Sequence, residues 1–147
     1  MKKVFLFFYV AILSNFCYSQ SKDEMAIKML LEKESATWRN GDVKGHAACW
    51  EIKPYTRIIV SKVDGTMVEV PPQIMIDPPA TMIGKGGAAV NTDYKIRVSG
   101  HTAWVSHNEI STAADGTKSY SYEFRMLEKI KGKWKLVGQS IHMYNPK

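Results

Sequence analysis

The first strong pattern along the chain is a run of apolar positions at helical spacing. Ser21 and Glu24 form a capping box, which is typical of the first turn of a helix. Gly41 fits the left-handed position that ends such a helix. The apolar stripe between these two ends consists of Ile27, Leu30, Leu31 and Trp38.

A second, shorter helix is predicted directly after this break. Asp42 is a good N-cap residue for a helix from Val43 to about Glu51. Ala47 and Trp50 would face inward from it. The Asn40-Gly41-Asp42 corner therefore places two helices at an angle on one surface.

After the second helix the pattern changes to alternating, β-rich segments separated by turn residues such as Asp64-Gly65, Ser99-Gly100, Asp115-Gly116 and Lys131-Gly132. The strands predicted in this way cover residues 55–62, 67–70, 93–100, 101–112, 118–130 and 133–144.

The segment 71–87 interrupts the strands with four prolines and three glycines. This composition allows only short helical turns and a loop. Its apolar residues Ile74, Met75, Ile76, Met82 and Ile83 indicate that it folds over another part of the molecule.

Helices followed by consecutive strands predict an α+β fold, in which the N-terminal helices pack against a strongly curved antiparallel sheet. The 147 residues, of which 45% are hydrophobic and 23% charged, suit a globular chain with a real core. We expect a single domain over residues 21–147.

Residues 1–20 have the layout of a secretory signal peptide: basic Lys2 and Lys3, an apolar run from Val4 to Leu13, then small and polar residues. That run is too short to span a bilayer, which takes about 20 residues. We therefore expect an exported protein, periplasmic or secreted, without a membrane span. Lipoprotein anchoring through Cys17 is the weaker alternative, because bulky Phe16 precedes it.

Charge and cysteine content narrow the function further. The formal net charge is +6, of which Lys2 and Lys3 carry two charges, and the remaining basic residues form no stripe or reader motif. This argues against nucleic-acid binding. Without Cys17 only Cys49 remains, and its helical pattern favours a buried, inert thiol.

Glu34 interrupts the apolar stripe of the first helix, because it falls between Leu31 and Trp38. Two interpretations remain open. In the first, the edge of the stripe is exposed to solvent or Glu34 pairs with an arginine. In the second, the carboxylate points into a cavity, where burial raises its pKa.

The last three strands carry alternating polar and aromatic faces. The polar faces hold His107 with Glu109, Glu123 with Arg125, and Ser140 with His142. The opposite face of the fifth strand holds Tyr120, Tyr122, Phe124 and Met126. We favour the polar faces inward, since a dimer could bury the aromatic one; the other orientation would make Glu123 and Arg125 a surface pair.

No metal site is predicted. His101, His107, His142 and Glu109 lack a tight ligand-spacing motif, so satisfied or exposed histidines are the simpler interpretation. No cofactor is expected either.

Four motifs together resemble the SnoaL-like group of the nuclear transport factor 2-like superfamily. They are "TWRNGD" closing the first helix, "AACW", "GHTAWVSHNE" and "YEFRMLEKIKGKWKLVGQSIH". The resemblance implies a cone-shaped, cystatin-like α+β barrel with a pocket at its wide end, partly walled by Trp38 and Trp50, and a homodimer formed through the outer sheet face. The pocket candidates are Glu34, Trp38, Trp50, Tyr55, His107, Glu109, Glu123, Arg125, Ser140 and His142.

The superfamily includes ketosteroid isomerases, limonene epoxide hydrolases and polyketide cyclases, so the fold does not fix a reaction. The isomerase set of a base Asp and a Tyr/Asp oxyanion hole does not map onto this chain. The epoxide-hydrolase site needs an Asp-Arg-Asp arrangement; Arg125 could supply the arginine, but the chain has no matching pair of aspartates. We therefore expect a domain that binds an unknown small molecule, with a cofactor-free hydrolase or isomerase using His and Glu as the alternative.

Overall fold

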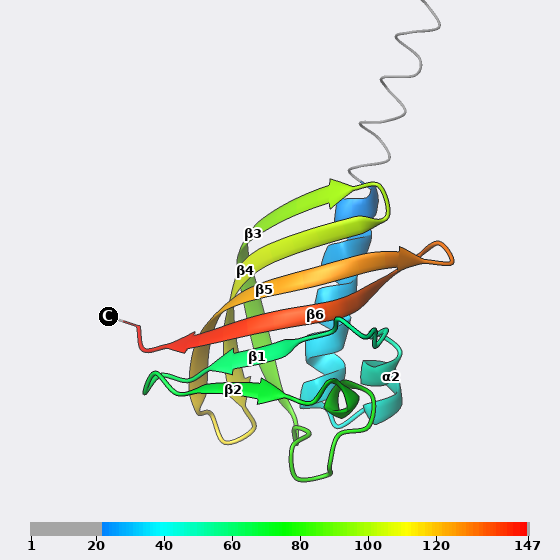
Figure 1. The fold of residues 1–147 in the computed structure, drawn as a ribbon. Helices are drawn as coiled ribbons and strands as arrows, with labels where there is room; N and C mark the ends of the chain where they lie inside the picture. The colour runs from blue at the N-terminus through cyan, green and yellow to red at the C-terminus, as the bar shows by residue number, and fades with distance from the viewer. Residues whose placement is uncertain (1–21, 147) are drawn as a thin grey trace, which may run out of the picture.

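One long helix and six strands make up most of the described structure (Figure 1). The computed structural model describes residues 22–146, so the predicted signal peptide, Cys17 and the Ser21 cap lie outside the described residues. The long helix covers residues 22–39. The other elements are α2 (Val43–Ala47), β1 (Ile58–Ser61), β2 (Met67–Val70), the 3-10 helix η1 (Pro72–Met75), β3 (Gly87–Ser99), β4 (Thr102–Ala113), β5 (Lys118–Ile130) and β6 (Lys133–Tyr144).

The strands form one curved sheet in the order β2-β1-β6-β5-β4-β3, and this sheet wraps around the long helix (Figure 1). The predicted α+β cone is confirmed, but the sheet is mixed rather than wholly antiparallel. β3 to β6 form an antiparallel meander, whereas β1 runs parallel to β6. The parallel pair arises because the β1–β2 hairpin packs against the free edge of the last strand instead of continuing the meander.

Two element boundaries differ from the sequence prediction. β3 begins at Gly87 rather than Asp93, because residues 87–92 also pair with β4; Asp93, with φ 56°, lies where the register shifts between Thr92 and Lys95. α2 ends at Ala47, after which the chain pairs with β6 through Trp50 and Leu136. The corner itself is as predicted: Gly41 has φ 73°, and Asp42 Oδ1 accepts a hydrogen bond from the Gly45 N–H at 2.8 Å.

The core lies between the long helix and the concave face of the sheet. Ile27 and Leu31 on the helix are fully buried, as are Val105, Leu127 and Leu136 on the strands. Further along the same helical stripe, Glu34 faces the sheet at the end where α2 and η1 close the cone. The apolar helix face therefore ends in a polar compartment.

The glycine-rich end of segment 71–87 holds the C-terminus of the long helix. The Gly84 N–H donates to the Trp38 carbonyl at 3.0 Å, and the Gly86 N–H donates to the Arg39 carbonyl at 2.7 Å. A Cβ at Gly84 would lie 2.6 Å from the Arg39 carbonyl oxygen, so only glycine fits this close approach. These contacts fix Trp38 and Arg39 at the mouth of the cone.

Candidate functional site

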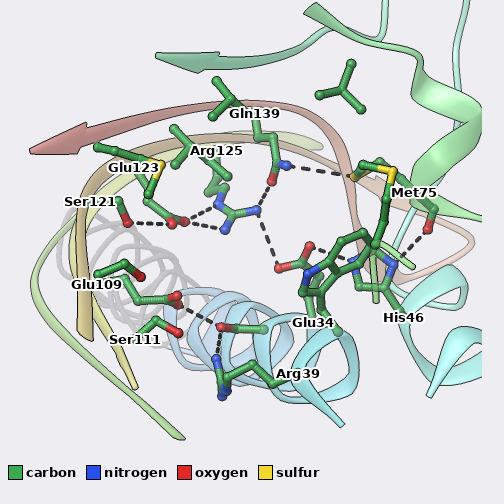
Figure 2. Close-up of a pocket in the computed structure, with 18 residues that line it drawn as sticks. Glu34, Arg39, His46, Met75, Glu109, Ser111, Ser121, Glu123, Arg125 and Gln139 are labelled. Carbon is green, nitrogen blue, oxygen red and sulfur yellow. Dashed lines mark hydrogen bonds and ion pairs between the residues drawn. The ribbon is translucent and has the colours of Figure 1, made fainter. Parts of the chain in front are cut away.

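The wide end of the cone contains a cavity of about 360 Å³ between the long helix and the sheet. Its lining combines apolar and polar side chains. The apolar ones are Val60, Val70, Met75, Met82, Ile141 and Met143. The polar ones are Glu34, Ser35, Arg39, His46, Glu109, Ser111, Ser119, Ser121, Glu123, Arg125 and Gln139, and Trp38 lies near the end of the long helix (Figure 2). The two kinds alternate across the sheet, since Ile141 lies opposite Glu123 and Met143 opposite Ser121.

Arg125 lies at the centre of the polar groups of the lining and is only 5% exposed. Its Nε donates to Glu123 Oε2 at 2.9 Å, and Nη2 donates to the same oxygen. Nη1 donates to Glu34 Oε2 at 3.4 Å and to Gln139 Oε1. Burial disfavours the charged guanidinium, but the carboxylates of Glu123 and Glu34 outweigh it and raise the pKa of Arg125.

Glu34 lies within hydrogen-bond distance of side chains from three separate parts of the chain. Besides Arg125, His46 Nε2 lies 3.0 Å and Trp50 Nε1 3.2 Å from Oε1. Burial by itself would raise the pKa of Glu34, but the charge of Arg125 and the bonds from His46 and Trp50 outweigh it and hold the pKa below its ordinary value. Glu34 thus both faces the cavity and pairs with an arginine. The prediction that its pKa would be raised in a cavity is wrong.

His46 and Gln139 are the residues of this cluster that sequence reasoning missed. The Nδ1 of His46 lies 2.8 Å from the Met75 carbonyl oxygen. Its Nε2 lies 3.0 Å from Glu34 Oε1, so the ring connects η1 with the long helix. A usable signal existed: His46 stands four residues before Trp50, on the predicted inward face.

Glu109 differs from the other two carboxylates of the cavity. Its Oε2 accepts a hydrogen bond from Ser35 Oγ at 2.7 Å, and Arg39 Nη1 in turn donates to Ser35 Oγ. In the described part of the chain it makes no ion pair within 4 Å. Burial and the nearby charge of Glu123 raise its pKa, against the weaker opposing effects of Ser35, Arg125 and Arg39. Glu109 is therefore the carboxylate whose charge is least compensated.

This leads to a prediction about stability. A carboxyl group with a raised folded-state pKa stabilises the fold at low pH and loses that contribution as the pH rises through that pKa. We expect Glu109→Gln to raise the melting temperature by about 2–5 °C at pH 7 and by little at pH 4. Thermal denaturation at both pH values measures this, and Glu69→Gln on exposed β2 is the control. An equal gain at both pH values would contradict the charge explanation.

His107 lies on the inward face of β4, as favoured, but it does not line the cavity. It is 1% exposed, its Nε2 is 3.6 Å from Glu123 Oε2, and its ring packs on Tyr94 with centroids 5.0 Å apart. Burial lowers the pKa of His107 more than the charge of Glu123 raises it. This histidine is a neutral neighbour of the site rather than part of its surface.

The other predicted pocket residues fall into those that line the cavity and those that do not. Trp38, Glu123 and Arg125 line the cavity with Glu34 and Glu109. Trp50 is not among the lining residues, but its Nε1 donates to Glu34 Oε1. Tyr55 is exposed and donates to Glu128 at 2.5 Å.

The inward orientation expected for Ser140 and His142 is wrong. Their side chains lie 2.9 Å apart on the outer face of β6. Gln139 pairs with Arg125 in the β5–β6 register. Because directly opposed residues share a face, Gln139, Ile141 and Met143 turn inward and their neighbours turn outward.

Three further features bear on what the chain can do. Among residues 22–146, no group of three or more His, Cys, Asp or Glu side chains is arranged to hold a metal ion. Within the same range, no helix is long and apolar enough to cross a membrane. Cys49 is free and buried, and burial followed by the charge of Glu34 raises its pKa to about 11, so its thiol is inert at neutral pH.

Comparison with solved structures identifies the fold. An NTF2-like (nuclear transport factor 2-like) protein of unknown function from Shewanella baltica superposes with a TM-score of 0.65 at 19% identity, over 86% of this chain and 97% of that one. An NTF2-like protein from Cytophaga hutchinsonii gives 0.64 at 20% identity, over 82% and 97%. A cystatin-like protein of unknown function from Nostoc punctiforme gives 0.64 at 14%, over 85% and 92%.

These similarities confirm the NTF2-like, cystatin-like fold that the sequence motifs predicted. No family model and no curated protein sequence matches the chain. Since the Shewanella and Nostoc proteins are of unknown function, the comparisons assign no reaction, and the SnoaL-like subgroup stays a prediction.

Proposed function

We propose that this chain, which has the fold of NTF2-like proteins, is an exported protein that binds a small molecule inside its cone. The observation that carries the proposal is the cavity with its mixed lining. Concave sites with mostly apolar walls and a few convergent polar groups are typical of small-molecule binding. Here Arg125 and the carboxylates around it form such a group among apolar side chains of the same cavity.

The buried charges also argue against a purely structural cone. An ion pair buried as deeply as Glu34 and Arg125 is often replaceable by apolar residues without loss of stability. Perturbed titratable groups beside a cavity are common at functional sites. The polar groups of the lining therefore have a simpler explanation as a preformed binding surface than as a stabilising device.

The experiment is a fragment screen by amide NMR with a cavity-filling control. We expect small amphipathic fragments to shift the amide signals of Glu34, Glu109 and Gln139. Val60→Trp, at an apolar residue of the lining, should abolish these shifts while the rest of the spectrum remains that of a folded protein. Fragments that bind both proteins equally, or no binding fragment at all, would overturn the proposal.

Export is supported by the layout of residues 1–20 and is tested by cell fractionation. The protein expressed with residues 1–20 should be found outside the cytoplasm. Deletion of residues 2–20 should keep the protein in the cytoplasm. The lipoprotein alternative requires Cys17, so Cys17→Ser separates anchored from free protein.

A second candidate function is acid–base catalysis in the same cavity, as a cofactor-free hydrolase or isomerase. The specific observation is Glu109, a cavity carboxylate with a raised pKa and one oxygen, Oε1, without a hydrogen-bond partner in the described residues. A general base needs such an open, tuned group. Assays of ester and epoxide hydrolysis and of ketone isomerisation test it: any activity found should fall about 100-fold or more in Glu109→Gln.

We also propose a homodimer through the outer face of the sheet. Trp104, Tyr122, Phe124, Met126 and Tyr144 are between 37% and 51% exposed there. The Trp104 and Phe124 rings stack with centroids 5.7 Å apart. Contiguous exposed apolar groups of this kind mark interaction surfaces.

The dimer leads to a prediction about oligomeric state. We expect Phe124→Lys to convert a dimer to a monomer in size-exclusion chromatography with light scattering, because a charge would be buried at the two-fold interface. Met67→Lys, an equivalent change on the edge strand β2, should leave the dimer intact. A wild-type monomer at about 100 µM would refute this interface.

A further inference from the structure

The charges around the cavity restrict what its ligand can be. Three carboxylates face it, from Glu34, Glu109 and Glu123, and each has a different partner set. Arg125 is the buried cation among them. Whether the cavity accepts an anion depends on whether Arg125 has hydrogen-bond donors left for a ligand.

Arg125 is almost fully engaged by the protein. A guanidinium has five N–H donors, and four hydrogen bonds run from Arg125 to Glu123, Glu34 and Gln139. An anionic ligand would find little of this cation free and would lie close to two carboxylates. Arg125 therefore holds the site together rather than serving as an anion receptor, as one would otherwise expect of a buried arginine.

Glu109 is in the opposite situation. Glu34 pairs with His46 and Arg125, and Glu123 pairs with Arg125, but within residues 22–146 Glu109 forms no ion pair and accepts one hydrogen bond, from the hydroxyl of Ser35. Arg39 is the nearest cation outside the buried cluster, and the Ser35 hydroxyl lies between it and Glu109. One carboxylate at the cavity thus lacks a counter-charge in contact.

Hydroxyl groups surround this carboxylate on the sheet. In the β4–β5 register Glu109 lies opposite Ser121, and Ser111 lies opposite Ser119, so the four side chains form a polar square on two neighbouring strands. All four line the cavity, and Figure 2 shows Glu109, Ser111 and Ser121 on this side. Ser121 Oγ donates to Glu123 Oε1 at 2.9 Å and so keeps its lone pairs for a ligand donor.

We propose that the ligand is an organic cation, with a protonated amine at Glu109 and a compact apolar body against Met75, Ile141 and Met143. This inference rests on the proposed binding function and adds the ligand class. An ammonium group supplies up to three donors, which matches the free oxygen of Glu109 and the serine hydroxyls. It also supplies the charge that this carboxylate lacks, in a site where burial strengthens the attraction.

The test uses three probes of the same shape: cyclohexylammonium, cyclohexanol and cyclohexanecarboxylate. Their dissociation constants are measured by amide NMR titration at pH 7.5. We expect the ammonium probe to bind about tenfold or more tightly than the alcohol, the gain typical of a charge-assisted hydrogen bond, and the carboxylate to bind weakest. Glu109→Gln should remove the preference for the ammonium probe over the alcohol, while Glu69→Gln should leave it unchanged.

A second readout separates this role from a general loss of structure. Ammonium binding should drive Glu109 to its ionised form and release protons when the solution pH lies near its raised pKa. Calorimetry in two buffers of different ionisation enthalpy measures that release. Glu109→Gln should release none, even if it binds the alcohol normally.

The outcomes distinguish this inference from the function on which it rests. Tightest binding of the carboxylate, for example at Arg39, would overturn the cation assignment and leave a binding cavity. Equal binding of all three probes would do the same. No shift with any probe at about 10 mM, together with a failed fragment screen, would remove both proposals.

Discussion

Arg125→Met should lower the free energy of unfolding by about 3–5 kcal/mol at neutral pH. Removal of one partner from a buried ion pair leaves an uncompensated charge, and here two carboxylates, Glu34 and Glu123, lose their shared cation. Urea denaturation followed by circular dichroism measures the change. Arg57→Met, at an exposed arginine that pairs with Glu69 at 3.4 Å, should cost less than about 1 kcal/mol.

A double-mutant cycle checks the cause. Adding Glu123→Gln to Arg125→Met removes one of the stranded charges, so the double variant should be more stable than the sum of the single changes by about 1–3 kcal/mol. Acidification should also narrow the gap between Arg125→Met and the wild type, because protonation neutralises the stranded carboxylates. Strict additivity at all pH values would show that lost packing, not charge, explains the effect.

Glu34→Ala should be the second most damaging change, at about 2–4 kcal/mol. It removes the acceptor shared by Arg125, His46 and Trp50, and leaves three buried donors without it. Chemical denaturation at several pH values is the measurement. The isosteric Glu34→Gln keeps the volume and one carbonyl oxygen, and therefore isolates the role of the negative charge.

The pH dependence of this effect has a fixed sign. The folded-state pKa of Glu34 lies below its ordinary value of 4.5. The contribution of Glu34 to the stability of the fold is therefore complete at pH values above the ordinary carboxylate pKa, and it is lost as the pH falls through the lowered pKa. The stability difference between wild type and Glu34→Ala should shrink below about pH 4. A difference that stays constant down to about pH 2 would contradict the charge model.

The elements of the fold were predictable because their signals are local. Asp42 and Gly41 mark the helical corner, the run Met67–Val70 is a strand with the predicted bounds, and alternation along β4 and β5 separates Glu109, Glu123 and Arg125 from the aromatic face. Such patterns report which side of an element is buried. On β6 the alternation did not reveal which set faces inward, because Gln139, Ser140 and His142 are all polar.

The residue pattern by itself thus determined an α+β layout and the shared polar face of β4 and β5, and the family resemblance added the cone. The pattern favoured that polar face as the inward one and left the environment of Glu34 open. Only the tertiary structure decided that Arg125 is engaged, that His46 and Gln139 belong to the site, that β1 joins β6 in parallel, and that Glu109 lacks a counter-charge. Periodicity reads neighbours a few residues apart, whereas Glu34 meets His46 across 12 positions and Arg125 across 91. Charge partners at such separations are set by sheet curvature and helix packing, which no local pattern encodes.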